Sequence, residues 1–144
     1  MHHSRLAGFM IDCRDGTLAD AAAFWSRALA LPVVAPDEGG RGRYAVLGPG
    51  PGGLHVEVQK VDHPPRVHLD IEADDIDAEA ARLEALGARR IECVRGRWWV
   101  MEAPTGHRFC VVPLRDPHQR AAPASWESSP PPSPPEPHPC TTAD

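Results

Sequence analysis

Apolar and polar residues alternate strictly along the stretch from Arg66 to Glu72. Alternation with a period of two is typical of a β-strand whose two faces differ. One face is apolar and is expected to pack against a helix: it carries Val67, Leu69 and Ile71. The other face carries an imidazole and two carboxylates: His68, Asp70 and Glu72. Because such groups are costly to bury without partners, this face is predicted to line water, a ligand or a metal.

The same reading predicts the other elements of the chain. Apolar residues recur at helical spacing from Leu18 to Leu29, and Pro32 ends this helix. A second helix is predicted after Asp74 and Asp75, which both offer an N-cap, and it stops at Gly87. Further strands are predicted over residues 6–13, 33–35, 44–47, 54–61, 89–94, 98–102 and 108–114.

These elements occur in the order strand, helix and three strands, and the order is given twice. A repeated unit that cannot bury its own sheet face is expected to pack with its second copy. The sequence therefore predicts an α+β fold over residues 5–115. Its two βαβββ modules, at about 5–61 and 66–114, are expected to form curved mixed sheets around a central cleft.

The composition changes after Asp116, because residues 117–144 contain nine prolines and one aromatic residue, Trp126. Such a segment buries too little apolar surface to order itself, so a disordered Pro-rich tail is predicted. The alternative is a polyproline-II motif for a partner at residues 130–132.

The net charge and the spacing of the cysteines limit the classes of binding partner that the sequence predicts. The formal net charge of -5 does not favour nucleic acid. No apolar run reaches the roughly 18 residues needed to span a membrane. The four cysteines lack the C-x-x-C spacing of zinc ribbons and thioredoxins. We therefore expect a cytoplasmic protein, a monomer or a homodimer, whose partner is a small molecule rather than nucleic acid or a membrane.

Several stretches of the chain resemble the glyoxalase-like branch of the vicinal oxygen chelate superfamily. They are VHLDIEADDID at 67–77, LEALGA at 83–88, WWVM at 98–101 and PTGHRFCVV at 104–112. The resemblance covers about residues 6–114 and implies the βαβββ repeat. The superfamily includes glyoxalase I, extradiol dioxygenases, methylmalonyl-CoA epimerase and bleomycin-sequestering proteins. Most of its enzymes hold a divalent metal with ligands from the first and last strand of each module.

The resemblance implies four ligand positions in this chain. His68 matches the first-strand ligand of module two, and Glu57 matches the last-strand ligand of module one. Gly8 falls on the first-strand position of module one, and Cys110 falls where the last strand of module two usually carries Glu. The resemblance thus implies an incomplete set of His68, Glu57 and Cys110 for zinc, nickel, manganese or iron. A site without metal is the alternative.

Strand parity adds further residues to the predicted cleft. Glu57 and Asp70 are the candidates for proton transfer, since paired carboxylates can do acid–base work. Four more residues are predicted to contact a ligand: Gln59, Glu72, Trp98 and Arg108. Structural alternatives stand beside these roles. His68 can be hydrogen-bonded within the sheet, Cys110 can be a small buried apolar residue, and Arg108 can form a plain ion pair.

Two main functions are compatible with these residues. In the first, a metal polarises a small oxygenated substrate as a Lewis acid, and the protein is a lyase or isomerase of the glyoxalase type. In the second, the cleft binds or sequesters a small molecule, such as a drug, without metal or catalysis. The His-bearing polar face favours the first function, whereas Gly8 and Cys110 at ligand positions favour the second. A third alternative is a scaffold recruited through the tail.

Overall fold

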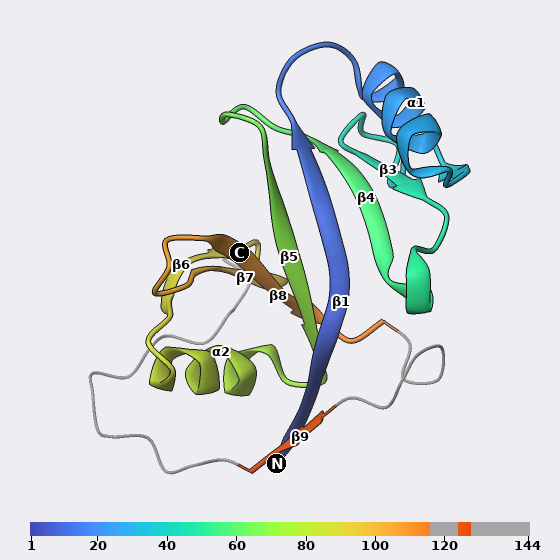
Figure 1. Ribbon diagram of the computed structural model, residues 1–144. Helices are drawn as coiled ribbons and strands as arrows, with labels where there is room; N and C mark the ends of the chain where they lie inside the picture. The colour runs from blue at the N-terminus through green and yellow to red at the C-terminus, as the bar shows by residue number, and fades with distance from the viewer. Residues whose placement is uncertain (116–123, 128–144) are drawn as a thin grey trace. The chain divides into compact units, whose positions relative to one another are not determined.

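The computed structural model describes residues 1–115 and 124–127. Two βαβββ runs follow each other along the chain (Figure 1). The first comprises β1 (His2–Cys13), α1 (Leu18–Leu29), β2 (Val33–Ala35), β3 (Tyr44–Leu47), the 3-10 turn η1 (Pro51–Gly53) and β4 (His55–Lys60). The second comprises β5 (Arg66–Ala73), α2 (Ile76–Ala85), β6 (Arg89–Val94), β7 (Trp98–Glu102) and β8 (Arg108–Pro113), and β9 (Ala124–Trp126) comes last. The predicted α+β fold with two βαβββ modules is confirmed.

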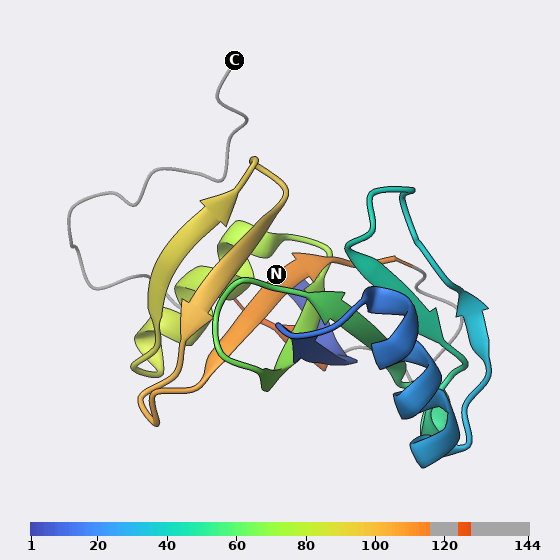
Figure 2. The ribbon, with the colours of Figure 1, turned by 90° about the horizontal axis from the view of Figure 1, so that it is seen from above.

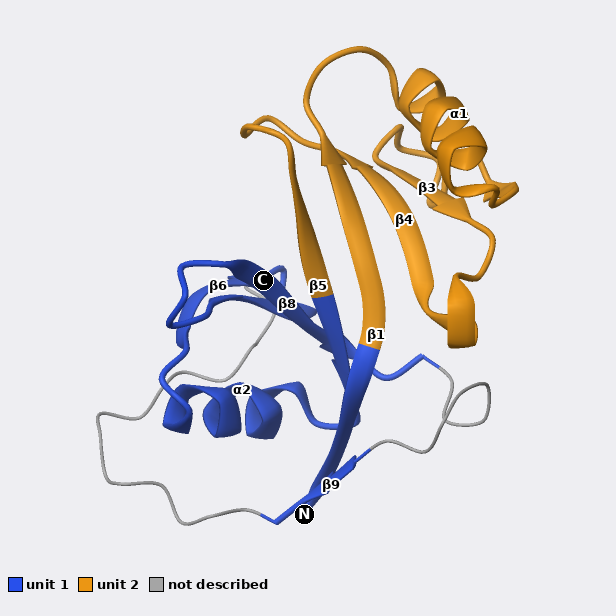
Figure 3. Cartoon of the chain, viewed as in Figure 1, with its two compact units in different colours: residues 1–6, 70–144 blue, residues 7–69 orange. Residues whose placement is uncertain are grey.

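The chain divides into two compact units (Figure 3). Unit 2 comprises Ala7–Leu69, and unit 1 comprises Met1–Leu6 with the described residues from Asp70 onward. The division crosses β1 and β5, so both strands contribute residues to both units. The module boundaries and the cleft that the sequence indicates stay predictions.

A mixed sheet in the order β2-β3-β4-β1-β5 forms unit 2. β4 runs antiparallel to β3 and parallel to β1. α1 begins where the backbone N of Asp20 donates to the Thr17 side chain at 3.1 Å, and it packs against β3 and β4 (Figure 2). The core between helix and sheet comprises Ile11, Leu18, Ala22, Ala45, Leu47, Val56 and Val58. Residues that alternate with these strand positions point to the face opposite α1.

Unit 1 is built in the same way around α2. β6, β7 and β8 form an antiparallel sheet that continues to β5, and α2 lies against one of its faces (Figure 2). The Asp75 side chain caps the helix by accepting hydrogen bonds from two backbone N–H groups. The core comprises Ala73, Ala80, Trp99, Met101, Phe109 and Val111. Among the described residues, neither helix combines the length and the apolarity that a membrane crossing needs.

The apolar side of β5 is less covered than predicted. Val67 and Leu69 are 58% and 50% exposed, whereas Ile71 packs against the core of unit 1. The expectation that all three residues pack against a helix is therefore wrong for the first two. The physical reason is the position of α1, which lies over β3 and β4 and leaves the first half of β5 exposed.

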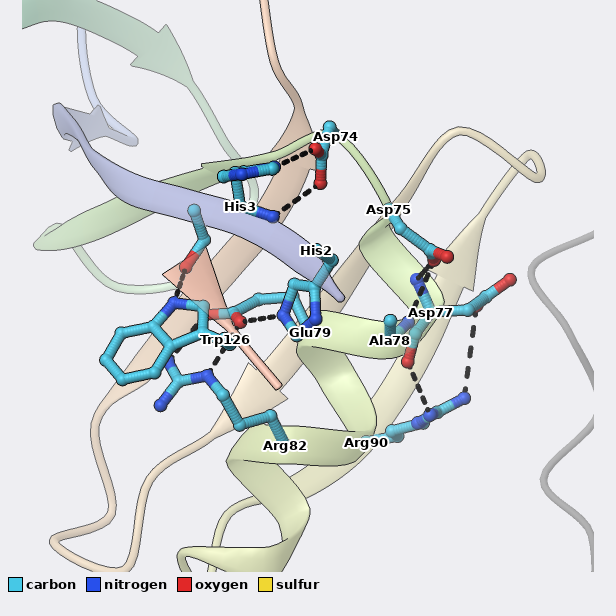
Figure 4. Close-up of polar contacts among 11 residues, drawn as sticks. His2, His3, Asp74, Asp75, Asp77, Ala78, Glu79, Arg82, Arg90 and Trp126 are labelled. Atoms are coloured by element: carbon cyan, nitrogen blue, oxygen red, sulfur yellow. Dashed lines mark hydrogen bonds and ion pairs between the residues drawn. The ribbon is translucent and has the colours of Figure 1, made fainter. Parts of the chain in front are cut away.

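Three residues of the predicted disordered tail form β9, so that prediction is wrong for Ala124–Trp126. β9 pairs antiparallel with His2–Ser4, and β1 accordingly begins four residues before the predicted strand. Trp126 donates from Nε1 to Ser4 Oγ at 2.7 Å. The Arg82 guanidinium lies 3.9 Å from the centroid of the Trp126 ring (Figure 4). The rest of the tail, including residues 130–132, lies outside the described residues.

A buried ion cluster lies beside β9 in unit 1 (Figure 4). Glu79 is fully buried, accepts hydrogen bonds from Arg82 at 2.8 and 2.7 Å, and lies 2.7 Å from His2 Nε2. Burial raises the pKa of Glu79, but hydrogen bonds from Arg82, His2 and Ser4 outweigh it, so the pKa lies below its usual value. The start of β1 is thus joined to α2 by the contact between His2 and Glu79 and to β9 by strand pairing.

Candidate functional site

The predicted site residues lie on the sheet faces opposite the helices. Their strand neighbours Val56, Val58, Phe109 and Val111 belong to the helix-side cores, so the alternate positions point the other way. The face opposite α1 carries Glu57, Gln59 and His68. The face opposite α2 carries Asp70, Glu72, Trp98, Arg108 and Cys110.

A buried carboxylate holds His68 in unit 2. The His68 Nδ1 atom lies 2.9 Å from Oδ2 of Asp12, which is only 2% exposed. Two more basic groups approach the same oxygen: Arg66 Nε at 3.6 Å and His63 Nε2 at 3.8 Å. His68 is therefore hydrogen-bonded within the sheet, and Nε2 is the nitrogen through which it would bind a ligand or a metal.

Glu57 is paired with a histidine that the sequence reasoning did not select. Glu57 is 3% exposed, and its Oε1 pairs with Nε2 of His55, two residues earlier on the same face of β4. Gln59, the next residue on this face, donates from Nε2 to the Tyr44 hydroxyl at 3.3 Å. A buried carboxylate beside an imidazole is suited to accept and return a proton.

Gly8 occupies the first-strand ligand position of module one, and the backbone around it leaves no room for a side chain. It lies opposite His55 in the parallel pair of β1 and β4. A Cβ atom added at Gly8 would overlap the carbonyl oxygen of His55 and would lie 2.6 Å from the carbonyl carbon. These are backbone atoms of a paired strand, which cannot swing aside as a flexible side chain can. Position 8 therefore cannot carry a ligand in this packing.

A carboxylate and a thiol come together in unit 1. Asp70 on β5 and Cys110 on β8 offer ligand atoms within 4.8 Å of each other. Cys110 is half-buried, and its thiol is not part of a disulfide. His68 precedes Asp70 by two residues on the same side of β5. Asp70 thus stands beside Cys110 as a carboxylate, whereas the expected carboxylate ligand, Glu57, is engaged by His55.

Two of the predicted ligand contacts are members of ion pairs. Glu72 is buried and accepts a hydrogen bond from Arg5 Nε at 2.6 Å. Arg108 Nε lies 3.1 Å from Oε2 of Glu102. Hydrogen bonds from Arg89 are the largest cause that lowers the pKa of Glu102. Arg108 therefore forms an ion pair, as the structural alternative expects. Its contact with a ligand stays a prediction.

Trp98 and Trp99 lie on opposite faces of β7. Trp99 belongs to the core and donates from Nε1 to Asp77 Oδ1 at 2.7 Å. Trp98 is half-buried on the face opposite α2, across from Val94 of β6. This placement leaves Trp98 on the face where a ligand contact is predicted.

Strand parity places two further residues, Asp12 and His55, on these faces, but the sequence assigned no role to either. The signal for His55 was its alternation with Glu57, two residues later. The signal for Asp12 was weaker, because its contact with His68 joins residues 56 positions apart and depends on the pairing of β1 and β5.

The side-chain donor atoms of His68, Asp70 and Cys110 are of types that bind zinc. An imidazole, a carboxylate and a thiolate are all ligands of this ion, and three protein ligands with one open position are typical of catalytic zinc sites. His68, Asp70 and Cys110 supply one group of each kind. Harder ions such as manganese prefer oxygen-rich sets, so the thiol favours the softer ion.

Comparisons with known proteins agree with this architecture. The glyoxalase-like domain family matches residues 8–112. No curated protein matches the sequence. Methylmalonyl-CoA epimerase from Mycobacterium tuberculosis superposes with a TM-score of 0.56 at 17% identity, over 76% of this chain and 88% of that chain.

Two further solved structures share the fold. A Streptomyces coelicolor methylmalonyl-CoA epimerase in complex with 2-nitronate-propionyl-CoA gives a TM-score of 0.54 at 18% identity, over 77% of this chain and 97% of that chain. Homoprotocatechuate 2,3-dioxygenase from Brevibacterium fuscum, in complex with 3,4-dihydroxyphenylacetate, gives 0.51 at 18% identity. That match covers 84% of this chain and 38% of the dioxygenase chain. The repeated βαβββ order and the family match lead to one conclusion: the chain belongs to the glyoxalase-like domain family, within the vicinal oxygen chelate superfamily.

Proposed function

We propose that the chain binds a small oxygen-bearing molecule and acts on it as a lyase or isomerase with the help of a divalent metal. The observation that carries this proposal is the approach of Asp70 and Cys110, with His68 two residues away on β5. Proteins of the same fold bind molecules of this kind, since the Streptomyces coelicolor epimerase holds a CoA ester analogue and the dioxygenase holds a catechol.

Each residue has a defined role in this proposal. His68, Asp70 and Cys110 hold the ion, which when bound supplies a Lewis acid that polarises a substrate oxygen. Glu57 exchanges the substrate proton. His55, whose Nε2 pairs with Oε1 of Glu57, lies beside the carboxylate that takes the proton. Four residues contact the rest of the molecule: Gln59, Glu72, Trp98 and Arg108.

A binding protein without metal is the second candidate function. The observation that favours it is Gly8, because the backbone of His55 prevents a ligand at this position of the family pattern. In this case the same faces bind or sequester a small molecule, such as a drug, and no bond is made or broken.

Metal content and thermal stability decide between the two functions. Cys13 and Cys110 provide a matched pair of variants, because Cys13 packs on the α1 side of β1 and Cys110 lies beside Asp70. We expect about one equivalent of zinc in the wild-type protein and in Cys13→Ser, a melting temperature that falls on chelation, and a loss of zinc in Cys110→Ser and His68→Ala.

The opposite result is equally clear. A protein that takes up neither zinc, nickel, manganese nor iron, and whose melting temperature is unmoved by chelator, overturns the metal-assisted function. Stabilisation by a small molecule in metal-free buffer then supports the binding protein, because a ligand that binds only the folded state raises its stability by mass action.

A further inference from the structure

Asp12 is a buried acid whose surroundings do not resemble a purely structural ion pair. It is 2% exposed near the end of β1, and His68 Nδ1, Arg66 Nε and His63 Nε2 all approach its Oδ2 atom. Its Oδ1 atom is also buried and has no hydrogen-bond partner among the described residues. Leaving a buried acceptor unpaired costs about 1–3 kcal/mol, so a residue selected for stability alone would not be placed this way.

The contact with His68 has one chemical consequence. An ionised carboxylate only accepts hydrogen bonds, so the imidazole nitrogen that faces Asp12 must carry the proton. At 2.9 Å the two atoms are at hydrogen-bond distance, and the nitrogen is Nδ1. The proton of the neutral ring is therefore fixed on Nδ1, and the lone pair is on Nε2.

Two basic side chains also face the carboxylate of Asp12. The Arg66 guanidinium lies 3.6 Å from Oδ2 and carries a permanent charge. Arg66 and His63 are also in contact, with 3.4 Å between Nη2 and Nε2. Arg66, the first residue of β5, thus brings a positive charge near the carboxylate, while His68, two residues later on the same strand, is at hydrogen-bond distance from it.

We propose that Asp12 is the positioning residue of His68: it holds the imidazole in the Nδ1–H tautomer and presents Nε2 as the nitrogen that binds. This inference rests on the proposed function for what Nε2 binds, but the tautomer itself does not depend on a metal. Carboxylates that orient a ligating histidine in this way are part of the working site, because they fix both the tautomer and the ring orientation.

The tautomer can be read directly in the full chain. Long-range proton–nitrogen NMR correlations distinguish Nδ1–H from Nε2–H in uniformly labelled protein at about pH 8.5, where imidazoles are ordinarily neutral. The signals of His68 are assigned by their loss in His68→Gln. We expect the Nδ1–H tautomer in the wild-type protein and in Asp15→Ala, whose carboxylate is 85% exposed two residues after the same strand ends.

The variants of Asp12 then test the cause. In Asp12→Ala the ring is expected to change to a mixture dominated by Nε2–H, which is the ordinary preference of neutral histidine in water. In Asp12→Asn the amide oxygen can still accept, so Nδ1–H is retained. A wild-type protein in the Nε2–H form overturns the proposal, and so does an Asp12→Ala protein that is folded but keeps the wild-type tautomer. The Asn variant keeps the test valid where Asp12→Ala does not fold.

A second measurement separates this inference from the proposed function. If the wild-type protein binds zinc, Asp12→Ala is expected to weaken the zinc affinity about 10- to 100-fold while Asp15→Ala leaves it unchanged. If the wild-type protein binds no zinc, the metal-assisted function fails, and the tautomer still decides whether Asp12 positions His68. An unchanged zinc affinity in Asp12→Ala contradicts the positioning role.

Discussion

Replacing Gly8 by alanine tests whether β1 can contribute a ligand. Gly8 does not lie in the left-handed region, so its backbone conformation is open to any residue. At such a position alanine ordinarily stabilises a protein by about 0.4–1 kcal/mol, because it restricts the unfolded chain. Here the opposite is expected, because the added Cβ would overlap the His55 carbonyl group.

The size of the effect follows from what must move. The nearest atoms to the added Cβ are the carbonyl oxygen, carbonyl carbon and nitrogen of His55, so β1 and β4 must separate locally. Overpacking in a core ordinarily costs about 1–3 kcal/mol, and each weakened strand hydrogen bond costs about 1 kcal/mol more. We expect a loss of about 3 kcal/mol in the free energy of unfolding for Gly8→Ala.

Equilibrium urea unfolding measures this loss, with Gly50→Ala as the matched control. A Cβ at Gly50 would meet its nearest neighbours at 3.3 Å, so that change is expected to stay within about 1 kcal/mol of wild type. Gly8→His is expected to be at least as destabilised as Gly8→Ala and to gain no metal affinity. A Gly8→Ala protein as stable as wild type would refute the argument that this ligand position is closed.

Three further predictions concern unit 1. The pKa of Glu79 is lowered in the folded state, so the carboxylate stabilises the folded protein fully above pH 4.5, its usual pKa, and this stabilisation is lost as the pH falls through the folded-state pKa. Urea midpoints should therefore fall more steeply on acidification in the wild-type protein than in Glu79→Gln. Trp126→Ala removes one hydrogen bond and one cation–π contact, so it is expected to lower the free energy of unfolding by about 1–3 kcal/mol in the same assay; an unchanged value would mean that β9 does not hold the start of β1 in solution. Arg108→Ala breaks only a partly exposed pair with Glu102 and should cost at most about 1 kcal/mol, so weaker ligand binding by that variant, measured by calorimetry, would show contact with the ligand rather than misfolding.

The sequence could predict which site residues share a face of the same strand, because side chains alternate along a strand. Glu57 and Gln59 share a face because side chains repeat every two residues, and the same holds for Arg108 and Cys110. The pairing of Glu57 with His55 also follows this local rule, although it was not selected. One face of each strand could therefore be assigned without knowledge of its neighbours.

Contacts between distant strands could not be predicted in the same way. The Asp12–His68 hydrogen bond depends on which strand lies beside β1 and in which register, and no local pattern determines that. The exposure of Val67 depends on where α1 lies over the sheet. β9 was missed for a related reason, because a three-residue strand is stabilised by its partners and the composition around Trp126 is typical of disorder.

Gly8 and Asp12 share one face of β1, since they lie four residues apart on the same strand. The family pattern expects a metal ligand at the first of these positions, and the backbone of His55 excludes it. At the second position the strand places a buried carboxylate against the imidazole of His68. β1 therefore contributes to the proposed site through the orientation of another strand's ligand rather than through a ligand of its own. On this argument, Asp12→Ala should weaken the zinc affinity at His68, whereas Gly8→His should add no metal affinity. The two variants together separate an indirect contribution of β1 to metal binding from a direct one.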